Sequence, residues 1–169
     1  MTTISYKRLY KKILSDATVN LRGIHRPSHW AHVIRNGIYI SEKEHLSPVV
    51  MKCFALLHDS QRLNDNEDPY HGQRAADYAI SIRETYLDIT DIDFERLVLA
   101  CTHHTKSIET SDIFVHACWD ADRLDLGRVG ITPDSYFLNT QTAKLIAEGE
   151  LFHLLEDFKP SESLLAEPI

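Results

Sequence analysis

A short apolar segment near the middle of the chain is the feature that most constrains the fold. From Val49 to Leu57 the sequence is apolar except for Lys52, and it then ends abruptly in His58 and Asp59. A helix that is apolar almost all round lies in the interior of a domain. Burying a charge costs several kcal/mol unless the charge is paired or bound to a metal. The segment therefore predicts a central helix whose last turn brings an ion pair or a metal site into the core.

The bulk composition restricts the function classes. The chain has 169 residues, of which 43% are hydrophobic and 25% charged, as in an ordinary soluble globular domain. A net charge of −7 without any basic block argues against binding to a nucleic-acid polymer, although a local basic cluster could hold a small phosphorylated ligand. No apolar run approaches the ~18 residues of a membrane helix, and there is no signal peptide. We therefore expect a cytoplasmic protein without a membrane partner.

The cysteines agree with this expectation. Cys53, Cys101 and Cys118 are an odd number, and no two of them form a CxxC pair. The pattern predicts free thiols on small core residues in a reducing compartment.

Helical periodicity and helix-start signals recur along the chain. No stretch alternates as a β-strand would, so we expect an all-α, single-domain bundle of six to eight helices. Gly37 lies within one expected helix and predicts a close helix crossing. Helices are expected over residues 2–16 and 28–41, and around residues 140–148 and 150–158. Four more helices are expected after the start signals Ser47-Pro48, Asp68-Pro69, Thr90 and Ser111-Asp112. A loop is expected over residues 60–68.

The same periodicity places several imidazole and carboxylate side chains in the interior or at its edge. His104 lies one turn after a buried stripe, and His71 lies one turn before another. Asp120 and Asp122 flank their stripe almost symmetrically, so periodicity does not choose between them. The converging set is His29, His58, Asp59, His71, His104 and one of Asp120 or Asp122. Such a mixed set of nitrogen and oxygen donors predicts one or two divalent ions, which could be Mn, Fe, Co, Ni or Zn.

The order His29, His58-Asp59, Asp122 resembles the H…HD…D signature of the HD-domain phosphohydrolase superfamily. A His-Gly helix start at residues 71–72, a His pair at 103–104 and Ala-Asp-Arg-Leu at 121–124 extend this resemblance over about residues 25–130. It implies a single domain of the HD type around a metal site, with residues 131–169 as a C-terminal helical extension. Carried over by position, it implies the metal ligands His29, His58, Asp59 and Asp122, with Asp120 and His32 left open as alternatives to Asp122 and His29.

The resemblance also implies a function. We expect an enzyme that hydrolyses a phosphoester or phosphoanhydride of a small phosphorylated substrate, a nucleotide, with a water activated on the ion. His71 and His104 match positions that hold a second metal in dinuclear members of the superfamily; we favour one firmly held ion, with the second as an alternative. The expected catalytic residues are Asp59, Arg62, His71 and His104. The expected substrate contacts are Arg62, His71, Arg74 and His104, since guanidinium groups bind phosphate bidentately.

Two further hypotheses belong to other classes. A non-catalytic module would keep the metal ligands and bind a nucleotide or protein without turnover. A di-iron oxygenase on the same scaffold would use His71 and His104 for a second iron. The sequence is compatible with a homodimer and with a monomer.

Overall fold

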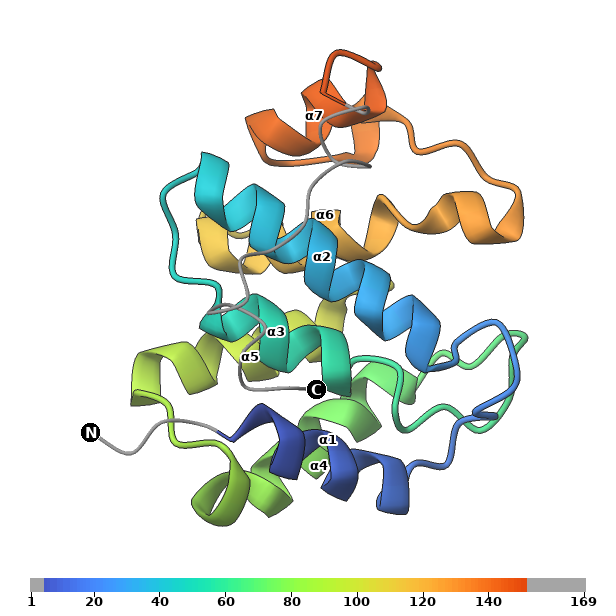
Figure 1. Ribbon diagram of the computed structural model, residues 1–169, viewed down its shortest axis with the longest axis vertical. Coiled ribbons are helices and arrows are strands. Elements are labelled where there is room, and N and C mark those ends of the chain that lie inside the picture. Colours follow the sequence, from blue (N-terminus) through green and yellow to red (C-terminus); the bar gives the residue numbers. More distant parts are fainter. Residues whose placement is uncertain (1–4, 152–169) are drawn as a thin grey trace.

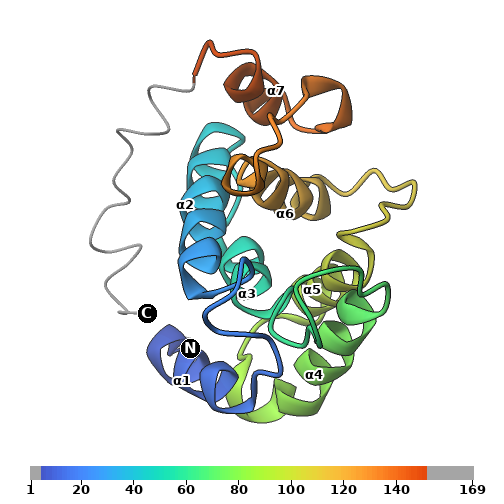
Figure 2. The same cartoon turned by 90° about the vertical axis from the view of Figure 1, so that its right-hand side faces the viewer.

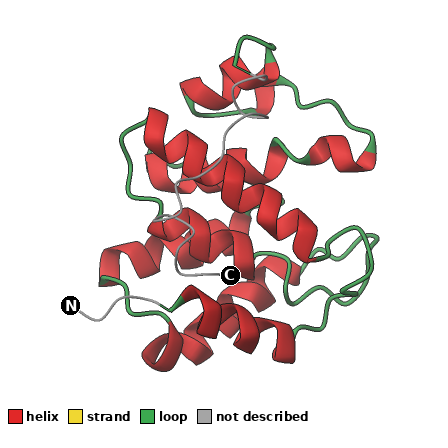
Figure 3. Ribbon diagram, viewed as in Figure 1, coloured by secondary structure: helices red, strands yellow, loops and turns green. Residues whose placement is uncertain are grey.

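The computed structural model describes residues 5–151 (Figure 1). Two short 3₁₀ turns, η1 (Leu126–Val129) and η2 (Ser135–Phe137), follow the sixth helix. Within the described range every regular element is a helix, which confirms the all-α prediction (Figure 3). The seven α-helices are α1 (Tyr6–Asp16), α2 (Pro27–Lys43), α3 (Val49–Leu57), α4 (His71–Tyr86), α5 (Asp91–His103), α6 (Ile113–Arg123) and α7 (Gln141–Ala147).

Helix α3 lies at the centre of the bundle. It packs against α1, α2, α4, α5 and α6, and both views show it enclosed by them (Figures 1 and 2). Its residues 50–57 are all buried, and the Lys52 ammonium lies 3.6 Å from the centroid of the Tyr6 ring. Because each fully buried large apolar side chain stabilises the fold by about 1.5–3 kcal/mol, α3 is a main source of stability. The predicted central helix is confirmed.

Two helix starts have the side-chain caps that the sequence predicts. Thr90 Oγ1 accepts a hydrogen bond from the backbone N–H of Asp93, and the Asp112 carboxylate accepts from the N–H groups of Phe114 and Val115. These bonds satisfy helix N–H groups that have no partner within the helix. Both predicted caps are therefore confirmed.

Two predicted caps are wrong, although α3 does begin directly after Ser47-Pro48. Helix α3 has Pro48 at its N-cap and no side-chain cap, so Ser47 does not serve that role. Helix α4 begins at His71 and not at Pro69, and its N-cap makes no side-chain hydrogen bond either. The reason is that the Asp68 carboxylate has other partners: it accepts from the backbone N–H of Leu63 at 2.8 Å and pairs with a guanidinium of α4.

Close backbone contacts at two glycines fix how the helices meet. A Cβ on Gly37 would lie 2.9 Å from the Cβ of Met51, which confirms the predicted tight crossing of α2 with α3. A Cβ on Gly72 would lie 2.5 Å from the carbonyl oxygen of Cys101. Helices α4 and α5 therefore touch at the start of α4 and the end of α5, the ends that carry His71 and His104.

The remaining sequence predictions concern the thiols and the two ends of the chain. All three cysteines are buried and free, as predicted, and burial raises the pKa of the Cys53 thiol to about 12. No helix between residues 5 and 151 is long and apolar enough to cross a membrane. Helix α7 confirms the element expected around residues 140–148, whereas the helix expected around 150–158 lies almost entirely outside the described residues.

Candidate metal centre

Three helix ends bring two histidines and two carboxylates together. His29 comes from the first turn of α2, His58 and Asp59 directly follow α3, and Asp122 lies at the end of α6. The Nε2 atoms of His29 and His58 are 3.1 Å apart. Nε2 of His29 is 3.5 Å from Asp59 Oδ2 and 3.3 Å from Asp122 Oδ1, and Nε2 of His58 is 3.4 Å and 3.7 Å from the same two oxygens.

These separations fit a shared cation. Ligand bonds of about 2.1 Å place neighbouring donors of a tetrahedral or octahedral ion about 3.0–3.4 Å apart. His29, His58 and Asp122 form one of the groups whose donor atoms all lie within 4.8 Å of one another. The donor set and its spacing therefore suit a divalent metal ion.

Hydrogen bonds on the far side of each ring orient the two imidazoles. The Nδ1 atom of His58 lies 3.2 Å and 3.1 Å from the carbonyl oxygens of Phe54 and Ala55, one turn earlier in the chain. The Nδ1 atom of His29 lies 2.7 Å from Oδ2 of Asp125. Because each Nδ1–H donates to an oxygen, both Nε2 atoms are left facing the cluster, as is usual for metal-binding histidines.

The structure separates Asp122 from Asp120, which the sequence could not do. The Asp120 carboxylate is fully buried and accepts hydrogen bonds from the N–H of Asn139 at 3.0 Å, and from the N–H and Oγ1 of Thr140 at 2.6 Å and 2.8 Å. Asp120 therefore anchors the segment that leads into α7, while Asp122 faces the histidines.

His32 is separated from His29 in the same way. The His32 side chain is 51% exposed, and its Nδ1 lies 2.9 Å from Oδ1 of Asp125. It thus sits on the outer side of Asp125, whose other oxygen contacts the ring of His29. Of these two histidines, only His29 reaches the cluster.

A second group of donors lies on the other side of Asp59. The Nε2 atoms of His71 and His104 are 2.8 Å apart, and they lie 3.3 Å and 3.7 Å from Oδ1 of Asp59. The two oxygens of one carboxylate therefore face two different sets of histidines. Nη1 of Arg62 lies 2.9 Å from His71 Nε2 and 3.4 Å from Asp59 Oδ1, so this second set already has a fixed positive charge beside it.

The electrostatics of the first cluster favour ionised carboxylates and protonated imidazoles in the absence of metal. Burial alone would lower the pKa of His29, but its hydrogen bonds to Asp122, Asp125 and Asp59 outweigh burial and raise the pKa to about 10. For Asp59 burial would raise the pKa, but the charge of His58 and hydrogen bonds from neighbouring histidines hold the pKa well below its usual range. A cation would take the place of these protons, because metal ligands must be deprotonated.

Two residues of the site were not anticipated from the sequence. His25 precedes α2, and its Nδ1 lies 2.6 Å from Asp59 Oδ2. Asp125 follows α6 and orients His29. Neither lies in a helix, so helical periodicity carried no signal for them. Their residue types, a His four positions before His29 and an Asp three positions after Asp122, were the only available indications.

A cleft of about 400 Å³ opens onto the cluster. Asp59, His71, His104 and Asp122 line it. Its basic residues are Arg62, Lys106, Arg123 and Arg128. The predicted substrate contact Arg74 is absent from its lining: the Arg74 guanidinium pairs with Asp68 at 2.5 Å and donates to the carbonyl oxygen of Gln61 at 2.9 Å. The structure therefore brings Arg62 to the cleft and leaves Arg74 outside it.

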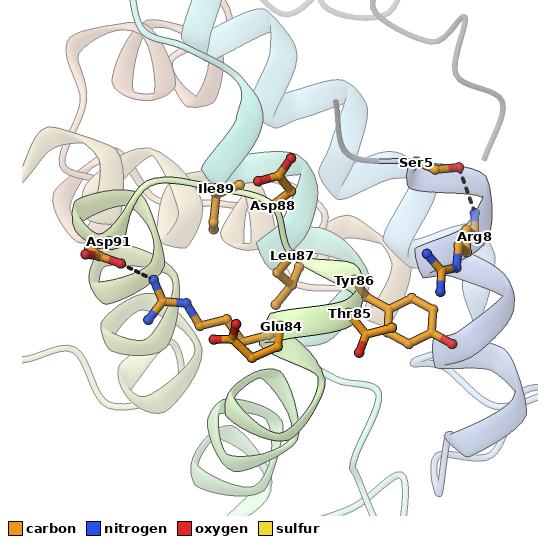
Figure 4. A pocket seen from close by; sticks show the side chains of 10 residues that line it. Ser5, Arg8, Glu84, Thr85, Tyr86, Leu87, Asp88, Ile89 and Asp91 are labelled. Atoms are coloured by element: carbon orange, nitrogen blue, oxygen red, sulfur yellow. Dashed lines mark hydrogen bonds and ion pairs between the residues drawn. The ribbon is translucent and has the colours of Figure 1, made fainter. Parts of the chain in front are cut away.

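A separate cleft of about 490 Å³ lies between α1 and the turn from α4 to α5 (Figure 4). Its arginines have partners of their own, because Arg83 pairs with Asp91 and the Arg8 guanidinium lies 4.6 Å from the centroid of the Tyr86 ring. None of the donor groups that could hold a metal among the described residues lines this cleft. It has no part in the candidate centre.

The helical bundle and the donors His29, His58-Asp59 and Asp122 together define an HD-domain fold. A crystal structure of a predicted HD superfamily hydrolase from an uncultured Thermotogales bacterium matches with a TM-score of 0.66 and 25% sequence identity, over 88% of this chain and 87% of that one. No protein-family model and no curated protein matches the chain. The HD-domain fold predicted from the sequence is confirmed by this structural match.

Proposed function

We propose that the protein is a metal-dependent phosphohydrolase that acts on a small phosphorylated substrate, a nucleotide. The observation that carries the proposal is the cluster of His29, His58, Asp59 and Asp122 donors beside a cleft with four basic residues in its lining. A divalent ion bound there would lower the pKa of its water from 15.7 to about 7 and polarise a phosphoryl oxygen.

The ion would be held by Nε2 of His29 and His58 together with Oδ2 of Asp59 and Oδ1 of Asp122. Two nitrogens and two oxygens suit Mn²⁺, Fe²⁺, Co²⁺, Ni²⁺ and Zn²⁺. Asp125 and the carbonyl oxygens at the end of α3 keep the rings in the orientation that binding requires.

A single ion is favoured over two because of Arg62. A second cation between Asp59, His71 and His104 would have to bind close to the guanidinium, whose Nη1 lies 2.9 Å from His71 Nε2. Arg62 is itself held in place, since it donates to the carbonyl oxygens of Asn64 at 3.3 Å and Asn66 at 2.8 Å. Like charges at such a distance repel strongly in a buried site.

The cleft suits an anionic substrate. Arg62, Lys106, Arg123 and Arg128 line it, and a divalent ion would add to their charge. Asp59, Glu67, Asp68 and Asp122 line the same cleft and balance these four cations, so the positive excess that would hold phosphate comes from the ion, although the whole chain carries −7. Arg62 faces the cleft beside Asp59, where its guanidinium could donate hydrogen bonds to phosphoryl oxygens that the ion does not contact. His71 and His104 line the same cleft, and the Nδ1–H of each donates to a backbone carbonyl oxygen, that of Asp68 or of Cys101.

The test compares two neighbouring aspartates. Asp122→Asn, and likewise His58→Ala and Asp59→Ala, should lose bound metal and the hydrolysis of a generic phosphoester while keeping the helical circular dichroism spectrum. The control is Asp120→Asn, which should keep both metal and activity but melt at a lower temperature, because Asp120 anchors the segment before α7. Full metal content in Asp122→Asn and His58→Ala would contradict the proposal.

The second set of donors, Asp59, His71 and His104, gives one competing function a structural basis. A di-iron oxygenase would require two irons in each chain and would release no phosphate. Elemental analysis of the purified protein, combined with a phosphate-release assay, separates this alternative from a hydrolase and also from a module that binds ligand without turnover.

A further inference from the structure

A second cleft adjoins the one above the metal centre. It has a volume of about 520 Å³ and lies along the segment between α6 and α7. Thr105, Arg123 and Leu126 line both clefts, so the two lie directly side by side. A ligand that reached the metal centre with one end could therefore lie in the second cleft with the other.

The chemical character changes from one cleft to the next. The first carries the charged groups of the metal centre and its basic residues. The second is lined by Ile131, Tyr136 and Phe137, whose side chains are 53%, 84% and 65% exposed. The rings of Tyr136 and Phe137 meet edge to face with centroids 5.1 Å apart. Large apolar groups gathered on the surface beside a polar site indicate a place where a ligand binds.

The aromatic pair is held on a fixed segment. The Asp134 carboxylate accepts from the backbone N–H of Tyr136 at 2.9 Å, and Arg123 donates to the carbonyl oxygen of Phe137 at 2.9 Å and to Ser107. Arg123 follows Asp122 directly, so the wall of the second cleft is tied to the residue beside the metal donors. These bonds hold the backbone that carries both rings, which lowers the entropic cost of placing the rings against a ligand.

We propose that the second cleft binds the base of a nucleotide by stacking on the ring of Phe137, with the ring of Tyr136 against the edge of the base, while the phosphate lies at the metal centre. This inference rests on the proposed function and adds the residues that would distinguish a nucleoside phosphate from a sugar phosphate. A flat aromatic group joined to an anion matches the order of an apolar cleft beside a site that a divalent ion would make positive. Stacking tolerates different bases because each of them has a π face.

The kinetic test uses the manganese-loaded protein. The four nucleoside 5′-monophosphates are compared with ribose 5-phosphate, which has the same phosphate and sugar but no base. At least one nucleotide should show a kcat/KM about tenfold or more above that of ribose 5-phosphate, as expected for one base–aromatic stacking contact. Phe137→Ala should remove most of this preference, because it lowers kcat/KM for the nucleotides far more than for ribose 5-phosphate. Ile92→Ala, which removes an exposed apolar side chain on α5, should change neither value.

A binding experiment keeps this inference separate from the proposed function. Isothermal titration with the free nucleosides should give binding to the wild-type protein and none to Phe137→Ala. If nucleosides bind in this way but no phosphate is released from any substrate, the cleft assignment stands and the hydrolase proposal fails. If ribose 5-phosphate is hydrolysed as efficiently as every nucleotide, or no nucleoside binds, the cleft assignment is overturned.

The same variants test whether the aromatic pair instead joins two copies of the chain. Light scattering of the wild-type protein and Phe137→Ala gives the oligomeric state of each. A dimer that becomes a monomer in Phe137→Ala, with an unchanged preference among substrates, would assign the aromatic pair to self-association and overturn the proposal.

Discussion

At the scale of single residues, the charge next to Asp59 determines how many cations the site can hold. Nη1 of Arg62 lies within 3.4 Å of both Asp59 Oδ1 and His71 Nε2. In this position a guanidinium balances the carboxylate on the side away from His29 and His58. It therefore takes the electrostatic role that a second metal ion would have there.

Arg62→Ala tests this role. We expect the variant to keep the first ion, to bind a second Mn²⁺ when the metal is in excess, and to show a KM about tenfold or more higher, because a charged hydrogen bond to phosphate contributes about 1.5–3 kcal/mol. Metal content after gel filtration and steady-state kinetics measure both effects. Arg74→Ala is the matched control and should bind one ion, since Arg74 pairs with Asp68 and does not itself line the cleft. An unchanged metal content in Arg62→Ala would contradict the explanation.

Single residues also show which metal ligands the sequence could predict and which it could not. Periodicity correctly sent His29 and His58 inward because each lies on a helix or directly at its end. It could not choose between Asp120 and Asp122, because the deciding contacts are the N–H groups of Asn139 and Thr140, far along the chain. Long-range partners of this kind leave no local pattern. The pairing of Arg74 with Asp68 was missed for another reason: Asp68 precedes a helix and was interpreted as its cap.

At the scale of elements, the close packing of α4 against α5 requires a residue without a side chain at position 72. Gly72 lets the start of α4 approach the carbonyl oxygens of Cys101 and Thr102, where a Cβ would lie 2.5 Å and 2.9 Å away. Backbone atoms cannot move aside as a flexible side chain can. The approach is what brings the rings of His71 and His104 within 2.8 Å of each other.

Gly72→Ala should therefore lower the free energy of unfolding by about 1–3 kcal/mol, the usual cost of forcing extra volume into a packed contact. It should also separate His71 from His104 and reduce hydrolysis while the first metal ion is kept. Urea denaturation and metal analysis measure these effects. Gly127→Ala should stay within about 0.5 kcal/mol of the wild type, because no atom lies within 4 Å of a Cβ there. Equal stability of the two variants would show that the contact is not tight.

The elements themselves were largely predictable. The apolar run from Val49 to Leu57 identified the central helix, and the capping residues Thr90 and Asp112 marked two helix starts. The error at α4 arose because Asp68, a good capping residue by type, is used by Leu63 and Arg74 instead. Capping statistics describe a local preference, which a buried ion pair can override.

At the scale of the whole molecule, the candidate centre joins helices that are distant in sequence. Its donors come from the start of α2, the end of α3 and the end of α6. An ion shared by all three helices would stabilise the folded state only, because the donors are far apart in the unfolded chain. Metal binding and folding should therefore be coupled.

Removal of the metal should lower the melting temperature. An ion present at about 100 times its dissociation constant adds about 2.7 kcal/mol, which corresponds to roughly 5–10 °C for a chain of this size. Calorimetry before and after treatment with EDTA measures the shift, and added Mn²⁺ should reverse it. Asp122→Asn should not respond to EDTA. A wild-type protein that melts at the same temperature with and without the chelator would argue against a resident ion.

The two-sided position of Asp59 has a consequence for how this protein can vary. Its Oδ2 faces the rings of His25, His29 and His58, and its Oδ1 faces Arg62, His71 and His104. Exchange of any one of those neighbours disturbs a single side, so natural variants could lose or remodel one half and keep the other. Exchange of Asp59 disturbs both halves at once, so no substitution at this position keeps either half intact.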